Sequence, residues 1–189
     1  MIKSLTGYRA RDGVEAADLA RINALVDAGG DPWARSTPLH LTASALIVHP
    51  ASQRVLLRWH ERQHAWLQVG GHADPGEEDP FEIARREGEE ETGLTDLVAY
   101  PEPGGPEPSG PELVHVVVVP VPAKADDPAH EHADLRFVLA TSHPEQARPE
   151  RPGAPVRWFS LPEAAEATTE ANLRETLDRV AQLFEHSPL

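Results

Sequence analysis

Residues 70–94, GGHADPGEEDPFEIARREGEEETGL, constrain the fold of this chain more than any other stretch. The pair Gly70-Gly71 allows the backbone to approach a ligand or a neighbouring strand closely. A helix is predicted over 80–92, because Asp79 is a favourable N-cap, a proline stands at the first helical position, and Gly93 follows the end. The stretch therefore places a glycine-rich loop next to an acidic helix.

Three glutamates of this predicted helix, Glu87, Glu90 and Glu91, lie three and four residues apart and share one helix face. Ionised carboxylates placed in this way repel one another by about 0.2–0.5 kcal/mol per pair. Oxygen ligands are those that Mg²⁺ and Mn²⁺ prefer, so the face favours a site for a hard divalent cation. For the glutamates alone, a solvated helix is the simpler explanation, since glutamate is a good helix former. The glycine pair and the acidic turn at 74–76 favour the metal site.

The whole stretch resembles the Nudix box, in which a glycine and a glutamate precede Arg-Glu-aliphatic-x-Glu-Glu-x-Gly-aliphatic. The matching positions are Gly71, Glu77, Arg86, Glu87, Glu90, Glu91, Gly93 and Leu94. One residue more than usual separates Glu77 from Arg86, and we place it in 78–80, before the helix. Gly88 stands where an aliphatic residue is usual, which costs about 1 kcal/mol of helix propensity relative to alanine.

The resemblance implies the Nudix α/β/α sandwich with a mixed β-sheet, and hydrolysis of a nucleoside diphosphate linked to another group. It implies that Glu87, Glu90 and Glu91 bind Mg²⁺ or Mn²⁺, with the Gly71 carbonyl as a further ligand. Arg86 would orient these carboxylates by ion pairing. The general base would be Glu87 or an acidic residue of a later loop, and the sequence leaves both open.

The remaining periodicity predicts helices over 13–28 and 168–184, the second of which is amphipathic. Strands are predicted over 39–49, 54–59, 66–69, 94–100, 113–121, 130–140 and 156–159, with a proline-rich loop over 101–111 and a polar connection over 124–129. Strands and helices do not alternate regularly, which favours a mixed sheet with helices on both faces. We divide the chain into an N-terminal helix and connector, 1–38, and a catalytic unit, 39–189, within one domain overall.

A second constellation lies on the predicted strand 130–140, where His130, His132, Asp134 and Arg136 alternate with apolar residues. Alternation puts all four on one face of the sheet, where they could line a substrate pocket and contact phosphate. An ordinary exposed strand face explains them equally well. A zinc site is a weaker interpretation, because the sequence pairs no obvious fourth ligand with them.

Other aromatic and imidazole side chains precede or follow the glycine pair. His72 is a candidate substrate contact, or else an ordinary loop residue. Trp59 and Trp66 could stack on a base, but the core is the favoured position for both.

Composition limits the partners. The net charge is −14, from 31 acidic and 17 basic residues, so the surface repels nucleic-acid duplexes, while a small phosphorylated nucleotide could bind beside a metal ion. There is no cysteine, no apolar run long enough for a membrane helix and no secretory signal, so a cytoplasmic location is expected. The helix at 13–28 or the C-terminal helix could support a homodimer.

Three other functions compete with this expectation. A prenyl diphosphate isomerase of similar fold relies on a cysteine that this chain lacks. A catalytically silent ligand-sensing domain would be marked by loss of the box glutamates, which are all present here. A hydrolase that removes unwanted nucleoside triphosphates remains open. A proline at the spacing of Pro111 occurs in relatives that hydrolyse ADP-ribose, but it carries little weight among so many prolines.

Overall fold

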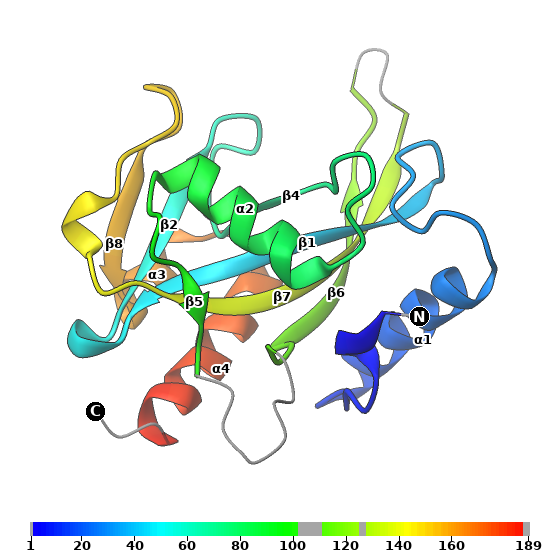
Figure 1. Ribbon diagram of the computed structural model, residues 1–189, viewed down its shortest axis with the longest axis horizontal. Helices are drawn as coiled ribbons and strands as arrows, with labels where there is room; N and C mark the ends of the chain where they lie inside the picture. The colour runs from blue at the N-terminus through cyan, green and yellow to red at the C-terminus, as the bar shows by residue number, and fades with distance from the viewer. Residues whose placement is uncertain (1, 102–110, 125–127, 187–189) are drawn as a thin grey trace.

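A computed structural model describes residues 2–101, 111–124 and 128–186, and it has a mixed sheet of eight strands at its centre (Figure 1). The order along the main path is β3-β2-β1-β7-β5, while β4 pairs with β1, β6 with β7 and β8 with β2. The strands are β1 (Leu39–His49), β2 (Arg54–His60), β3 (Ala65–Leu67), β4 (Val69–Gly71), β5 (Val98–Ala99), β6 (His115–Val121), β7 (His130–Ala140) and β8 (Val156–Ser160). The predicted mixed sheet is confirmed, because β1 and β7 are parallel and their other neighbours are antiparallel.

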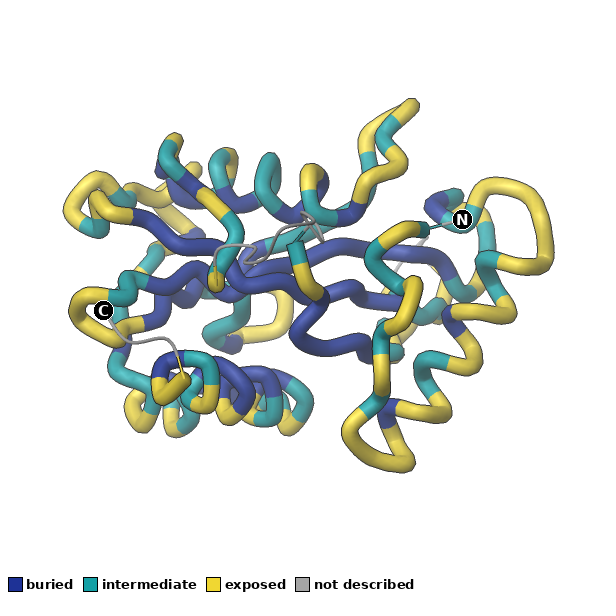
Figure 2. The backbone as a smooth tube through the Cα atoms, turned by 60° about the horizontal axis from the view of Figure 1, so that its bottom comes forward, coloured by how far each residue is buried: buried dark blue, intermediate teal, exposed yellow. Residues whose placement is uncertain are grey.

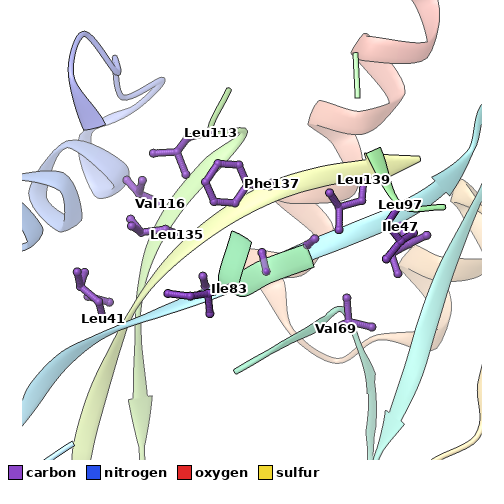
Figure 3. Close-up of a cluster of buried hydrophobic side chains, with 14 of the residues drawn as sticks. Leu41, Ile47, Val69, Ile83, Leu97, Leu113, Val116, Leu135, Phe137 and Leu139 are labelled. Atoms are coloured by element: carbon purple, nitrogen blue, oxygen red, sulfur yellow. The ribbon is translucent and has the colours of Figure 1, made fainter. Parts of the chain in front are cut away.

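The long pair β1 and β7 gives the sheet two different faces. Its register places Leu41, Ala43, Ala45 and Ile47 beside Ala133, Leu135, Phe137 and Leu139. These apolar side chains form one core with Ile83 of the helix α2 (Pro80–Thr92), as Figure 3 shows. The opposite face is polar at the beginning of both strands and apolar towards their ends, so it can support both a core and a polar site.

Helices cover both faces. Figure 1 shows α2 in front of the sheet and the C-terminal helices α3 (Leu161–Ala167) and α4 (Ala171–His186) behind it. Helix α4 buries Leu173, Leu177, Val180 and Phe184 on the sheet, and Figure 2 shows its outer side exposed. This arrangement is the α/β/α sandwich that the sequence predicts. Among the described helices, none combines the length and the apolar character needed to span a bilayer.

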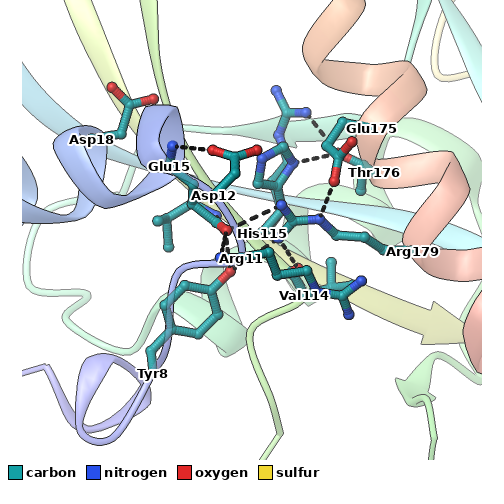
Figure 4. A network of polar contacts seen from close by, with 12 residues as sticks. Tyr8, Arg11, Asp12, Glu15, Asp18, Val114, His115, Glu175, Thr176 and Arg179 are labelled. Atoms are coloured by element: carbon teal, nitrogen blue, oxygen red, sulfur yellow. Dashed lines mark hydrogen bonds and ion pairs between the residues drawn. The ribbon is translucent and has the colours of Figure 1, made fainter.

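The N-terminal helix α1 (Gly13–Asp27) is joined to the rest of the fold by a buried ion pair (Figure 4). The Arg179 Nη1 atom of α4 donates to Glu15 Oε1 at 2.7 Å, and the Tyr8 hydroxyl donates to the same carboxylate oxygen. Burial raises the pKa of Glu15, but the hydrogen bonds from Arg179 and Tyr8 outweigh it and hold the pKa at about 2. The N-terminal segment therefore packs as part of one unit with the sheet.

Three predicted elements differ most from the structure. The strand expected over 94–100 is only Val98–Ala99, because the Asp96 carboxylate accepts hydrogen bonds from Thr141 Oγ1 and the Ser142 N–H instead. The strand expected over 66–69 divides at residue 68, since β3 pairs with β2 and β4 pairs with β1. The last helix begins at Ala171 rather than 168.

Two predicted loops lie only partly within the described residues, and the predicted strand between them is shorter than expected. The proline-rich loop expected over 101–111 has residues 102–110 outside the described part of the chain. The strand expected over 113–121 begins at His115. Part of the connection expected over 124–129, residues 125–127, is also outside the described part.

Candidate active site

Strand β4 and the start of α2 bring the predicted loop and the predicted acidic helix together. Asp79 caps α2 by accepting a hydrogen bond from the Phe81 N–H, Pro80 occupies the first turn, and Gly93 ends the helix at a φ of 68°. These features confirm the predicted helix ends.

The glycine pair lets the backbone approach its neighbours where no side chain would fit. A β-carbon at Gly70, whose φ is 148°, would lie 2.4 Å from Ser44 Cβ on β1. A β-carbon at Gly71 would lie 2.6 Å from the Cδ atom of Glu87. The Gly71 backbone therefore lies directly beside a box carboxylate, as a shared metal site requires.

Arg86 holds the loop onto the helix, as the ion-pairing role implied. Its guanidinium makes two hydrogen bonds with Glu77, at 2.9 and 3.0 Å, and donates to the His72 carbonyl at 3.0 Å. The same side chain reaches Glu87 at 3.0 Å and Glu90 at 3.2 Å. Hydrogen bonding to Arg86 lowers the pKa of Glu77. One arginine thus connects four points around the site.

The three box glutamates differ in their surroundings. The side chains of Glu87 and Glu91 are 17% and 12% exposed, while that of Glu90 is 56% exposed. Burial raises the pKa of Glu87, and it raises the pKa of Glu91 to about 7. Glu91 accepts from the Gly70 N–H at 3.2 Å and pairs with Arg58 at 3.0 Å. Two desolvated carboxylates beside a backbone carbonyl suit a cation, since a positive charge would offset the cost of ionising them.

Each of the three carboxylates is nevertheless paired with an arginine. In the described part of the chain, a group of three or more ligand atoms within 4.8 Å of one another occurs at His40, His130 and His132, and the glutamates form no such group. Arg86 lies between Glu87 and Glu90, and Arg58 takes Glu91. The three glutamates therefore share one helix face, as predicted. The group paired with each carboxylate is a guanidinium.

The four polar residues His130, His132, Asp134 and Arg136, called here the β7 ladder, lie on one face of the sheet, as their alternation predicts. Their environments differ. Asp134 and Arg136 are buried, and Arg136 Nε donates to Asp134 at 2.8 Å. Asp134 also accepts from Thr42 and Ser44, and Arg136 binds the Asn172 carbonyl of α4. These two residues have structural partners, and a role in substrate binding stays a prediction.

The two histidines of the ladder lie nearer to solvent and belong to a cluster with His40 and His72. Burial lowers the pKa of His72 to about 3 and that of His132 to about 4. Arg35 and the other histidines act in the same direction, while Asp134 partly opposes them at His132. Both imidazoles are therefore neutral near pH 7.

Trp59 and Trp66 lie against each other on β2 and β3, with ring centroids 5.6 Å apart. Trp59 is half-buried. Trp66 is also half-buried and packs against the core on the α4 side, with its ring centroid 5.2 Å from that of Phe159, so it lies at the edge of the core.

Two residues near the site were not predicted. Arg58 pairs with Glu91, and its position beside apolar Leu56 on the core side of a predicted strand is the pattern that could have identified it. His40 lies at the centre of the histidine cluster. Its alternation with Thr42 and Ser44, opposite the apolar positions of the same strand, could have identified a polar face.

With this geometry in place, comparison with known proteins identifies the class. A family model described as the NUDIX domain matches residues 38–180. No match is found among curated proteins. An Ap4A hydrolase of C. elegans, solved as a binary complex, has a TM-score of 0.59 and 19% identity, covering 78% of this chain and 98% of that one.

Two further solved structures share the fold at similar identity. A NUDIX-family hydrolase from Clostridium perfringens has a TM-score of 0.55 and 22% identity, covering 78% of this chain and 97% of that one. The dihydroneopterin triphosphate pyrophosphohydrolase of E. coli has a TM-score of 0.54 and 19% identity, covering 78% and 96%. An α/β/α sandwich with a complete set of box glutamates thus defines a pyrophosphate-cleaving hydrolase. The chain belongs to the NUDIX family.

Proposed function

We propose that this protein hydrolyses a pyrophosphate bond in a nucleoside diphosphate linked to another group, with Mg²⁺ or Mn²⁺ bound at the α2 carboxylates. The observation that carries the proposal is the position of the Glu87 carboxyl against the Gly71 backbone, with Glu91 buried beside Gly70. When bound, a divalent ion would neutralise the negative charge on the phosphoryl oxygens. Glu87, Glu90 and Glu91 would hold it together with the Gly71 carbonyl.

The chain's own residues perform the positioning. Arg86 fixes loop 72–77 against α2 through Glu77 and the His72 carbonyl, so the Gly71 carbonyl keeps its direction. Glu87, whose pKa is raised by burial, is suited to take a proton from the attacking water, and we assign it this role. Arg58 keeps Glu91 in place in the free protein and would release it when a cation binds.

The substrate side of the proposal rests on the face that β1 and β7 share. His72, His130 and His132 line this face, and their ring N–H groups can donate to phosphoryl or base atoms. The net charge of −14 disfavours a nucleic-acid duplex as partner. A homodimer and a cytoplasmic location are further proposals, which light scattering and fractionation of cells would test.

A substrate screen tests the function. Nucleoside diphosphates linked to other groups, dinucleoside polyphosphates and nucleoside triphosphates are incubated with Mg²⁺ or Mn²⁺. Phosphate is read after phosphatase treatment for the compounds blocked at both ends, and after inorganic pyrophosphatase treatment for the triphosphates. We expect turnover of at least one compound and loss of most of it in Glu90→Gln. Glu89→Gln is the matched control, because Glu89 pairs with Arg85 outside the site.

The outcomes separate the candidates. Turnover of nucleoside triphosphates alone would favour removal of unwanted nucleotides over the diphosphate-linked class. Binding without turnover of any compound would favour the catalytically silent domain. Wild-type turnover that EDTA leaves unchanged would contradict the metal mechanism.

A further inference from the structure

Four histidines from three separate segments meet on the sheet face opposite α2. His40 comes from β1, His72 from the residue after β4, and His130 and His132 from the start of β7. The ring centroids of His40 lie 5.2 Å from His72, 5.4 Å from His130 and 5.1 Å from His132. His72 also lies 4.8 Å from His132. The four rings thus form one compact group.

The ring nitrogens, rather than the ring carbons, face the middle of this group. His40 Nε2 lies 3.1 Å from His72 Nε2, and His130 Nε2 lies 3.2 Å from His132 Nε2. Ligand nitrogens about 2.0–2.1 Å from a tetrahedral zinc ion lie about 3.3–3.4 Å from one another. For His40, His130 and His132, ligand atoms lie within 4.8 Å of one another, so small side-chain rotations would bring them around one ion.

Two of the imidazoles are oriented as metal ligands usually are. His40 Nδ1 lies 3.0 Å from the Thr37 carbonyl oxygen, and His130 Nδ1 lies 2.9 Å from the Pro128 carbonyl oxygen. Because a carbonyl only accepts, each Nδ1 carries the hydrogen and donates it. With the hydrogen on Nδ1, the Nε2 atom of each ring is the one that can bind a metal, and it faces another histidine of the group. Such a donation from the second nitrogen to a carbonyl is the usual outer-shell support of a metal-bound histidine.

Access and ligand type also agree. His40 is buried, whereas His72, His130 and His132 are half-buried, so an ion can enter from solvent while His40 forms the floor. Imidazole nitrogens suit zinc and similar transition-metal ions, while carboxylate oxygens suit magnesium and manganese. The α2 carboxylates and the histidine cluster are therefore chemically different sites.

We propose that His40, His72, His130 and His132 together bind one transition-metal ion of the Zn²⁺ type, separate from the metal site of the α2 glutamates. The proposal does not depend on the hydrolysis proposed above, but it replaces the substrate contacts of His72, His130 and His132, because an imidazole that binds a metal through Nε2 cannot also donate from that atom. Because His72 directly follows Gly71, the bound ion would tie the loop that leads into α2 to strands β1 and β7.

Equilibrium dialysis of tag-free protein against Zn²⁺ with excess Mg²⁺ tests the site, and metal per chain is the readout. We expect one zinc ion per wild-type chain, and the same in the triple variant Glu87→Gln/Glu90→Gln/Glu91→Gln. The double variant His40→Gln/His132→Gln should lose the zinc ion. Its affinity for zinc should fall by more than about 10–100-fold, which is the typical effect of removing a residue that only supports a ligand. The control is His143→Gln/His186→Gln, which changes two exposed histidines.

A measurement on the unaltered cluster protects the test against a variant that fails to fold. X-ray absorption of the zinc-loaded wild type and the triple glutamate variant should show nitrogen neighbours at about 2.0–2.1 Å with imidazole scattering. Cobalt substituted into either protein should give the intense visible bands of a tetrahedral site. Zinc that disappears in the glutamate variant, survives in the double histidine variant, or has only oxygen neighbours would overturn the proposal.

Discussion

Gly71 and Glu87 are in such close contact that a β-carbon on the glycine would fall 2.6 Å from the Glu87 carboxyl group. Gly71→Ala should therefore displace the carboxylate and cost about 1–3 kcal/mol of stability, the usual range for overpacking. Turnover should fall by about 100-fold, because a displacement of about 1 Å in an active site has effects of that size. Urea unfolding and the hydrolysis rate measure both. Gly13→Ala, at a position with nothing within 4 Å, is the control. Equal behaviour of the two variants would show that the contact is unimportant.

Glu91 gives a pH dependence with a definite sign. Its pKa in the metal-free folded protein is about 7, raised by burial from 4.5, so the folded state holds this proton more tightly than the unfolded state. The carboxylate therefore lowers stability increasingly as pH rises from about 4.5 through about 7. Relative to wild type, Glu91→Gln should gain up to about 3 kcal/mol across this interval, since one pKa unit corresponds to about 1.4 kcal/mol.

Urea unfolding of both proteins in EDTA, repeated from pH 4 to pH 8, measures this difference. Taking the difference removes the opposite effect of His72 and His132, whose lowered pKa values reduce stability as pH falls below 6.5. A stability difference that does not change with pH would refute the assignment of a buried, proton-binding Glu91.

The ion pair between Glu15 and Arg179 predicts that the N-terminal helix is integral to the fold. Both side chains are almost fully buried, so Arg179→Met should leave an unpaired charge and cost about 3–5 kcal/mol. Arg21→Met is the matched control, because Arg21 joins α1 to Glu131 on β7 through an exposed pair worth about 0–1 kcal/mol. Denaturant unfolding measures both. A cost for Arg179→Met as small as that of the control would mean that α1 is only loosely attached.

The space around Gly88 limits the size of the side chain that this position of α2 can hold. A β-carbon there would meet Leu97 Cδ1 at 2.9 Å, and Ile47 and Leu139 lie 3.5 Å away. Gly88→Ala should be close to neutral, since a gain of about 1 kcal/mol in helix propensity offsets a small shift of the end of Leu97. Gly88→Ile, which restores the usual aliphatic residue, should cost about 1–3 kcal/mol by overpacking. Thermal unfolding distinguishes them, and an isoleucine variant more stable than wild type would contradict the packing.

The box helix could be predicted because its determinants are local. Asp79, Pro80 and Gly93 set its ends within the sequence that they terminate, and the spacing of the glutamates follows from the helical period. The alternation on 130–140 likewise predicted one shared face for His130, His132, Asp134 and Arg136, which the register confirms.

The pairings across the sheet could not be predicted, because they depend on which strands become neighbours. The parallel register of β1 and β7 puts His40 opposite His132, and the return of β4 along β1 adds His72. The same strand pairings bring His40 and His72 to His130 and His132, and the sequence alone did not indicate these additional ligands. Likewise, the strand pattern could place Arg58 on the core side of β2, but it could not identify Glu91 as the partner, because that pair joins β2 to the end of α2.

The most direct test of the central claim is the dependence of hydrolysis on Mg²⁺ and Mn²⁺ after EDTA treatment, for wild type, Glu87→Gln and the control Glu89→Gln. The substrate is the compound that the screen identifies. Wild type and Glu89→Gln should be inactive without metal and regain saturable turnover, while Glu87→Gln should stay at least about 100-fold slower at every metal concentration. Full turnover in EDTA, or a Glu87→Gln variant as fast as wild type, would contradict the assignment of this site.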